Sequence, residues 1–186
     1  MSTRVIAGTA KGQRLQLVPG DSTRPITDKV KESLFNIINQ SIYQTSVLDL
    51  FAGTGAVGIE ALSRGAEYVL FNEFNRSAIQ TIHDNLKSTK LDTLADVQMA
   101  DAFKVLQAKP PRTFDYIYIA PPQYKGVWLD IMHALDKNPE WLSPTTIVIV
   151  QIDPKEHEDA LFRHMRDYDQ RTYGNTLLWF FESITT

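Results

Sequence analysis

The residues with the clearest chemical potential lie in the run DLFAGTGAVG at positions 49–58. Gly53, Gly55 and Gly58 have the GxGxxG spacing that lets a nucleotide ligand approach the backbone closely. This spacing also occurs in sites that bind NAD. Asp49 distinguishes the two cases, because its carboxylate would repel a pyrophosphate and can pair with an ammonium group. The combination favours S-adenosylmethionine, which has an amino-acid end, a ribose and an adenine, but no phosphate.

Other residues of the loop and of the segment after it complete the predicted ligand site. Glu73 ends the next predicted strand, where its carboxylate can bind a ribose, and Phe74 can either flank an adenine or pack in the core. No GK[ST] sequence follows the glycines, which excludes a Walker A loop, and no GxSxG elbow supports a hydrolase. The loop residues expected at the ligand are Asp49, Phe51, Ala52, Gly53, Thr54, Gly55 and Gly58.

Strands and helices alternate along the chain from residue 46. The pattern predicts strands at 46–51, 68–73, 96–101, 114–120 and 145–152, and helices at 56–64, 75–88 and 126–137. A further helix is expected from Pro154 to about 167, followed by two β segments about Gly174 and Asn175. This alternation is typical of an α/β fold with a mostly parallel sheet and helices on both faces. Ligands of such sheets bind at the carboxyl ends of the strands.

The composition indicates a folded protein without thiol chemistry. The chain has 186 residues, of which 43% are hydrophobic and 22% charged, and it contains no cysteine. These values exclude wholesale disorder, a disulfide framework and a cysteine nucleophile. His83, His133, His157 and His164 show no metal-ligand spacing, so we expect no metal. Without a visible signal peptide or membrane span, we expect one cytoplasmic, monomeric domain over residues 1–186.

The charges are distributed unevenly. Residues 1–40 contain six Lys or Arg against three Asp or Glu, whereas the rest of the chain is acidic and the net charge is −3. A hairpin is expected over residues 4–18 and an amphipathic helix over 28–39. Cations in this basic extension can contact RNA phosphates, which positions an RNA without reading its sequence. The candidates are Arg4, Lys11, Arg14, Arg24, Lys29 and Lys31.

The sequence resembles the RsmD family over nearly its whole length. The matching segments are RVIAGTAKGQRL at 4–15, TRPITDKVKESLFNII at 23–38, VLDLFAGTGAVGIEALSRGA at 47–66 and RTYGNTLLWFF at 171–181. This resemblance implies a class I, Rossmann-like methyltransferase fold of seven strands with the last strand antiparallel. It further implies S-adenosylmethionine as methyl donor and the N2 amine of a guanine in small-subunit (16S) ribosomal RNA as acceptor. Asp101 and Ala102 stand where the family contacts adenine.

The segment Ala120-Pro121-Pro122-Gln123-Tyr124 departs from the family pattern (D/N)PP(Y/F). In that pattern a side chain and a backbone carbonyl accept hydrogen bonds from the amine, and the aromatic ring stacks on the extruded base. The side chain of Ala120 has no acceptor, although its backbone carbonyl and that of Pro121 remain, Gln123 could supply an amide oxygen, and Tyr124 can still stack. Three alternatives follow: an active enzyme that uses Gln123 or backbone acceptors, methylation of another target, or an RNA-binding assembly factor with little catalysis. A dehydrogenase is the remaining alternative, and Asp49 opposes it.

Overall fold

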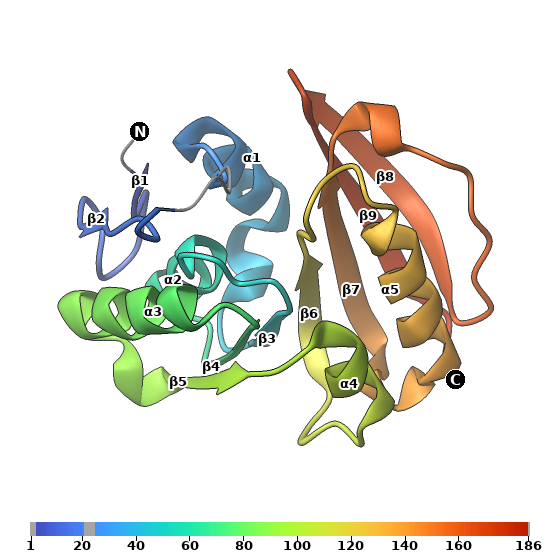
Figure 1. Cartoon of the computed structure of the whole chain (residues 1–186), viewed down its shortest axis with the longest axis horizontal. Helices are drawn as coiled ribbons and strands as arrows, with labels where there is room; N and C mark the ends of the chain where they lie inside the picture. Colours follow the sequence, from blue (N-terminus) through green and yellow to red (C-terminus); the bar gives the residue numbers. More distant parts are fainter. Residues whose placement is uncertain (1–2, 21–24, 186) are drawn as a thin grey trace. The chain divides into compact units, whose positions relative to one another are not determined.

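The computed structural model describes residues 3–20 and 25–185. Seven strands form a sheet in the order β5-β4-β3-β6-β7-β9-β8, and two further strands form a small hairpin (Figure 1). The contacts divide the chain into two compact units, residues 1–100 and 101–186. Each unit is described separately.

The first unit combines the hairpin with a parallel three-stranded part of the sheet. The hairpin pairs β1 (Thr3–Arg4) with β2 (Arg14–Leu15), as predicted, although its strands are short. The remaining elements are α1 (Asp28–Ile38), η1 (Asn39–Ile42), β3 (Ser46–Asp49), α2 (Ala56–Ser63), β4 (Tyr68–Glu73), α3 (Arg76–Thr89), η2 (Asp92–Leu94) and β5 (Ala95–Met99). Side chains of Thr27 and Asn75 cap α1 and α3 at the predicted starts of these helices.

Helices α2 and α3 cover the same face of this part of the sheet (Figure 1). Gly58 makes the close approach of α2 possible, because an added Cβ would lie 2.3 Å from the ring of Phe71 on β4. Gly55 begins α2 with a left-handed φ of 79°. The glycine spacing of the loop therefore has a local structural cause, which is the tight turn from β3 into a helix packed on the sheet.

The second unit contains α4 (Ala102–Gln107), β6 (Phe114–Ile119), α5 (Val127–Lys137), η3 (Pro139–Trp141), β7 (Leu142–Ile152), η4 (Pro154–Glu156), β8 (Met165–Tyr173) and β9 (Thr176–Ser183). Strands β6 and β7 are parallel, and β9 is antiparallel to both β7 and β8. The indole of Trp128 on α5 packs against that of Trp179 on β9, with centroids 5.5 Å apart. Helix α4 is absent from the sequence-based prediction.

The predicted helix from Pro154 to about residue 167 is wrong. Only the single turn η4 forms there, and β8 starts at Met165, opposite Ser183 of β9. The carboxylate of Asp136 accepts hydrogen bonds from the backbone N–H groups of Arg163 and His164, which supports an extended chain before β8. Pairing with a distant strand thus decides the structure of a segment whose apolar spacing also suits a helix.

Candidate active site

Asp49 ends β3 and is 1% exposed. Its Oδ2 accepts a hydrogen bond of 3.2 Å from the Gly58 N–H, whereas its Oδ1 is buried and has no hydrogen-bond partner among the residues that the structure describes. Burial raises the pKa of this carboxyl group to about 7, and repulsion from the Glu73 carboxylate adds to the rise, whereas the hydrogen bond from the Gly58 N–H opposes it. A buried carboxylate oxygen that lacks a donor is a position where a cationic ligand group would be stabilised.

Glu73 ends β4 and turns its carboxylate to the glycine loop. Its Oε2 accepts from the Gly53 N–H at 2.9 Å, and its Oε1 accepts from the N–H groups of Phe74 and Asn75. The loop is also anchored by Asn85 of α3, whose amide donates to the Thr54 carbonyl. These bonds bring the two carboxylates predicted at the ligand, Asp49 and Glu73, to one loop.

The other residues predicted at the cofactor have varied environments. Phe51 is half-buried, Ala52 is buried, and Phe74 is 73% exposed, so Phe74 does not pack in the core. In the second unit, Asp101 caps α4 through a bond from the Lys104 N–H, and Ala102 is buried in the first turn. Capping gives Asp101 a structural role, and its predicted contact with adenine stays a prediction.

The segment 120–124 follows β6 directly. Ala120 and Gln123 are half-buried, Pro121 is buried, and Pro122 and Tyr124 are exposed. The Tyr124 N–H donates to Glu156 Oε1 at 2.7 Å, and its hydroxyl donates to Asp153 Oδ2. The loop that follows β7 thus contacts the loop that follows β6.

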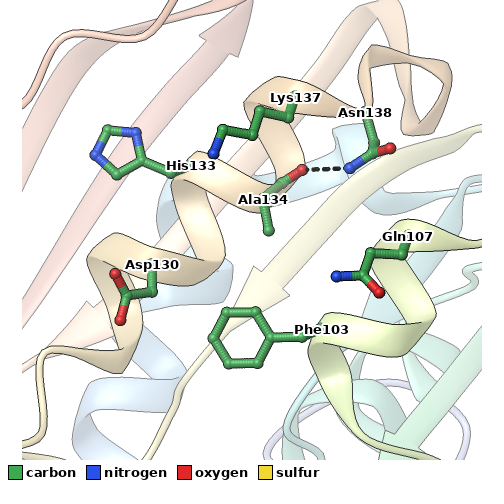
Figure 2. Close-up of a pocket in the computed structure, with 7 residues that line it drawn as sticks. All are labelled: Phe103, Gln107, Asp130, His133, Ala134, Lys137 and Asn138. Carbon is green, nitrogen blue, oxygen red and sulfur yellow. Dashed lines mark hydrogen bonds between the residues drawn. The ribbon is translucent and has the colours of Figure 1, made fainter.

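A depression of about 710 Å³ lies between α4 and α5 (Figure 2). Phe103 and Gln107 line it from α4, and Asp130, His133 and Lys137 line it from α5. None of the residues predicted at the cofactor or in the segment 120–124 lines this depression. Within the described ranges, no three His, Asp or Glu side chains form a cluster that could hold a metal ion, and no helix is long and apolar enough to span a membrane.

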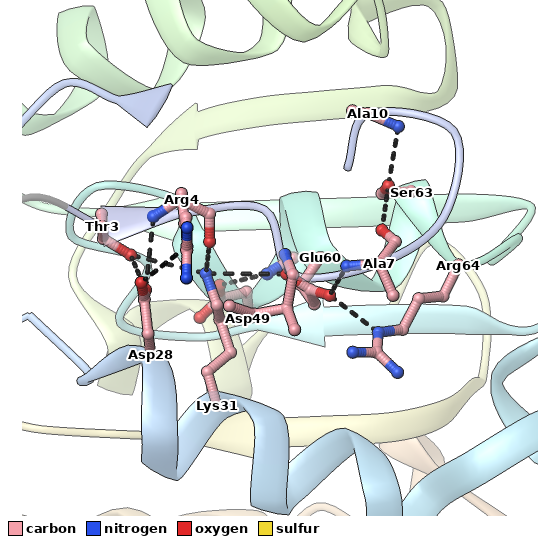
Figure 3. A network of polar contacts seen from close by, with 12 residues as sticks. Thr3, Arg4, Ala7, Ala10, Asp28, Lys31, Asp49, Glu60, Ser63 and Arg64 are labelled. Atoms are coloured by element: carbon pink, nitrogen blue, oxygen red, sulfur yellow. Dashed lines mark hydrogen bonds and ion pairs between the residues drawn. The ribbon is translucent and has the colours of Figure 1, made fainter. Parts of the chain in front are cut away.

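A buried network docks the N-terminal hairpin on α2 (Figure 3). The Glu60 carboxylate accepts hydrogen bonds from the N–H groups of Ile6 and Ala7 at 2.8 and 3.0 Å. It also pairs with Lys31 Nζ at 3.6 Å and with Arg64 Nε at 2.7 Å. Both Lys31 and Glu60 have fully buried side chains. One carboxylate therefore joins α1, α2 and the hairpin.

Lys31 is a correction to the predicted RNA contacts. Its ammonium group donates to the Arg4 carbonyl and lies against Glu60, and burial lowers its pKa despite the nearby carboxylates. A fully buried cation cannot touch an RNA phosphate. Lys11, Arg14 and Lys29 are exposed, and Arg4 is exposed although it pairs with Asp28. Arg24 lies outside the described residues.

Gly8 allows the hairpin to lie directly on α2, because an added Cβ would be 1.7 Å from the Ser63 carbonyl oxygen. We expect Gly8→Ala to destabilise the protein by ~2–3 kcal/mol, since both the left-handed backbone and the contact are disturbed. Gly12 has the same φ of 85° with no atom of the described residues within 4 Å of the added Cβ, so Gly12→Ala should cost only ~1 kcal/mol. Urea unfolding of both variants measures the difference, and equal losses would show that the contact is unimportant.

A family model described as conserved hypothetical protein 95 matches residues 3–182. Haemophilus influenzae ribosomal RNA small subunit methyltransferase D is 32% identical over 154 residues, which are 81% of this chain and 78% of the relative. The chain belongs to the RsmD family. YlbH of Bacillus subtilis is 43% identical over 175 residues, or 93% of this chain and 95% of the relative. Membership in the RsmD family, predicted from the sequence, is confirmed.

The structure of yhhF from Escherichia coli matches the fold with a TM-score of 0.85, 29% identity and 98% coverage of both chains. Together with the seven-stranded, mostly parallel sheet, this likeness confirms the predicted class I methyltransferase fold. The RsmD resemblance did not single out Asp153 and Glu156, which contact Tyr124. The available signal was topological, since β6 and β7 are parallel neighbours and their carboxyl ends share one edge of the sheet.

Proposed function

We propose that this protein transfers a methyl group from S-adenosylmethionine to the N2 amine of a guanine in small-subunit ribosomal RNA. The observation that carries the proposal is the buried Asp49 carboxylate at the glycine loop, whose Oδ1 has no partner within the described ranges 3–20 and 25–185. The RsmD relatives named ribosomal RNA small subunit methyltransferase D support the choice of substrate. Such a substrate implies a cytoplasmic enzyme, and we extend the proposal to one monomeric methyltransferase domain over residues 1–186.

The residues of the first unit fit the methyl donor. Asp49 can pair with the ammonium group of its amino-acid end, and Glu73 keeps acceptor capacity for ribose hydroxyls beside its three backbone donors. At Gly53 no described atom lies within 4 Å of where a Cβ would be, so the loop backbone there is open to close approach, whereas Gly55 faces the core and allows the tight turn. We assign the adenine to Phe74, Asp101 and Ala102, and keep Phe51, Ala52, Thr54 and Gly58 as parts of the loop. The donor supplies an electrophilic methyl carbon on a sulfonium.

The segment 120–124 would position the base. The new N–C bond forms as the S–C bond breaks, and the amine loses one proton to solvent. Because the N2 lone pair is delocalised into the guanine ring, orientation of the amine contributes most of the rate effect. The carbonyls of Ala120 and Pro121 and the amide oxygen of Gln123 are the available acceptors, and Tyr124 can stack on the base. Pro122 stiffens the turn between them.

The hairpin and α1 would meet the RNA backbone. Arg4, Lys11, Arg14 and Lys29 present exposed cations there, and Arg24 is kept as a sequence-based candidate. Contacts of this kind give affinity that decreases with salt and carries no sequence information.

The test is methyl transfer from labelled S-adenosylmethionine to 30S particles from a strain without the homologous enzyme. We expect label on the N2 of one guanine, identified by mass spectrometry of ribosomal RNA nucleosides. Label on another base would refute the guanine assignment, and absence of label would refute the enzymatic one. Titration with S-adenosylhomocysteine and with NAD provides a second test, because binding of NAD alone would exclude the methyl donor.

Ala120 favours a second candidate function, an RNA-binding assembly factor that retains the cofactor pocket. Loss of one acceptor for the amine would cost ~1–3 kcal/mol, which lowers the rate about 10- to 100-fold but leaves measurable turnover. Turnover that is no more than about 100-fold slower than that of an enzyme with the full motif supports the enzymatic function. Tight binding of RNA and cofactor without turnover would support the assembly factor.

A further inference from the structure

Two carboxylates that follow β7 hold Tyr124 at opposite ends. Glu156 Oε1 accepts from the Tyr124 backbone N–H at 2.7 Å, and Asp153 Oδ2 accepts from its phenolic hydroxyl. Both carboxylates come from the turn 153–156, in which Asp153 also accepts from the Lys155 N–H. The backbone carbonyl of Glu156 in the same turn accepts a hydrogen bond of 3.1 Å from the indole N–H of Trp128. The turn is thus tied to both the segment 120–124 and the start of α5.

Tyr124 needs such a support. Its φ of 60° lies in the left-handed region, which a residue with a Cβ rarely adopts without surrounding contacts that stabilise it. The residue is also 64% exposed, so core packing does not hold its ring. The hydrogen bond to Glu156 holds the backbone of Tyr124, and the hydrogen bond to Asp153 fixes the direction of its side chain.

We propose that Asp153 and Glu156 are positioning residues that hold the ring of Tyr124 ready to stack on the substrate base. This inference rests on the proposed function. Within that function, Asp153 and Glu156 help to orient the aromatic ring that stacks on the base. In this chain the aromatic residue comes one position later than in (D/N)PP(Y/F), and Ala120 offers no side-chain acceptor. An aromatic ring that is already oriented loses less conformational entropy when the base binds.

The geometry distinguishes an acceptor role of Glu156 from a role of its charge. One oxygen bonds to Tyr124, whereas Oε2 is buried and has no partner among the described residues. In Glu156→Gln the amide oxygen can still accept from the Tyr124 N–H, so the loop remains held. In Glu156→Ala the acceptor is lost. Glu158 is an exposed carboxylate two residues further along, and Glu158→Gln serves as the matched control.

The kinetic test measures kcat and KM for RNA at saturating methyl donor. We expect kcat to decrease about 10-fold in Glu156→Ala, in line with the loss of one hydrogen bond, and to stay within about threefold in Glu156→Gln. Tyr124→Phe keeps the ring but loses the bond to Asp153, so its kcat should decrease as well, whereas Tyr124→Ala should be the slowest. An unchanged kcat in both Glu156→Ala and Tyr124→Phe overturns the proposal. Equal losses in Glu156→Gln and Glu156→Ala overturn the acceptor role.

A readout without turnover separates this inference from the proposed function. Hydrogen exchange of the Tyr124 amide should be at least about 10-fold faster in Glu156→Ala than in the unaltered protein, Glu156→Gln or Glu158→Gln. Affinity for S-adenosylhomocysteine should not change, because the glycine loop is untouched. If the unaltered protein transfers no methyl group, the proposed function fails, and the exchange data alone then decide whether the carboxylates hold Tyr124. Equal exchange in all variants refutes the positioning role. If Glu156→Ala does not fold, Tyr124→Phe at its exposed site provides the decisive kinetic comparison.

Discussion

Replacing Asp49 by asparagine should weaken the binding of S-adenosylhomocysteine ~30- to 4,000-fold. Removing one charge of a buried ion pair costs ~2–5 kcal/mol, and each 1.4 kcal/mol is about tenfold in affinity. Asparagine has nearly the shape of aspartate, and its oxygen can still accept from the Gly58 N–H, so the loop should keep its conformation. Isothermal calorimetry measures the loss. Asp92→Asn, at an exposed turn of the same unit, is the control and should bind normally.

The same substitution should change how stability depends on pH. The pKa of Asp49 is about 7 in the fold, above its ordinary value of 3.8. Between these values the native state keeps a proton that the unfolded chain has lost, so the free energy of unfolding should decrease as pH rises from 4 to 7 and then level off. Asp49→Asn removes this decrease, which is on the order of a few kcal/mol. Denaturant unfolding at pH 5 and pH 8 measures this difference. An equal change in the free energy of unfolding in the unaltered protein and in Asp49→Asn would contradict the raised pKa of Asp49.

Ligand binding should also release a proton. At pH 6 most of the ligand-free protein carries a neutral Asp49, and a ligand ammonium group favours the ionised form. The calorimetric heat should therefore depend on the ionisation enthalpy of the buffer at pH 6 and much less at pH 8.5. Asp49→Asn should show no such dependence. A buffer-independent heat for the unaltered protein at pH 6 would mean that Asp49 does not pair with the ligand.

Local sequence signals were sufficient where local interactions decide the structure. The short segment YVLFNE at 68–73 predicted β4 with its observed bounds, and Thr27 and Gly55 mark helix starts through their own backbone or side-chain geometry. Helix α4 has six residues, too few for a periodic pattern. The segment 154–167 was misassigned because the pairing of β8 with β9 is a long-range interaction that no local window contains.

In the candidate site, too, local features could be predicted from the sequence and features that depend on tertiary contacts could not. Asp49 and Glu73 were recognisable by residue type and by their position at strand ends, but the raised pKa of Asp49 follows from burial, a tertiary property. Helical spacing places Lys31 on the same face of α1 as the apolar residues Leu34, Phe35 and Ile38, so its burial had a signal in the sequence. Its partner Glu60 lies on another helix, 29 residues further along the chain, so the sequence alone could not identify the buried ion pair.

Glu60→Ala should destabilise the protein by ~3–5 kcal/mol, because it leaves the buried Lys31 ammonium without its counter-charge. It also removes the acceptor of the Ile6 and Ala7 N–H groups, so the hairpin should detach from α2. Denaturant unfolding gives the loss of stability, and faster hydrogen exchange over residues 5–15 would report the detached hairpin. A loss below ~1 kcal/mol would show that the network contributes little.

The double variant Lys31→Met with Glu60→Gln is the informative control. It removes both buried charges, and glutamine can still accept a hydrogen bond from the hairpin backbone, so much of the stability should return. We expect a strong coupling energy between the two positions in the cycle formed by this double variant and the single variants Lys31→Met and Glu60→Gln. Additive losses would mean that Lys31 and Glu60 act independently, in conflict with the buried ion pair.

The salt dependence of RNA binding distinguishes the exposed cations that can contact phosphates from Lys31, which is buried and supports the hairpin. Lys11 and Arg14 are exposed on the docked hairpin, so Lys11→Ala with Arg14→Ala should lower the dependence of log affinity on log salt by ~1.4–1.8, for two lost phosphate contacts. The Lys31→Met, Glu60→Gln variant keeps both cations and should retain the slope of the unaltered protein, although it also lacks one lysine. If that slope decreased by ~0.7–0.9 in a folded protein, Lys31 would have to reach a phosphate in the complex, and the hairpin would have to leave α2 when RNA binds.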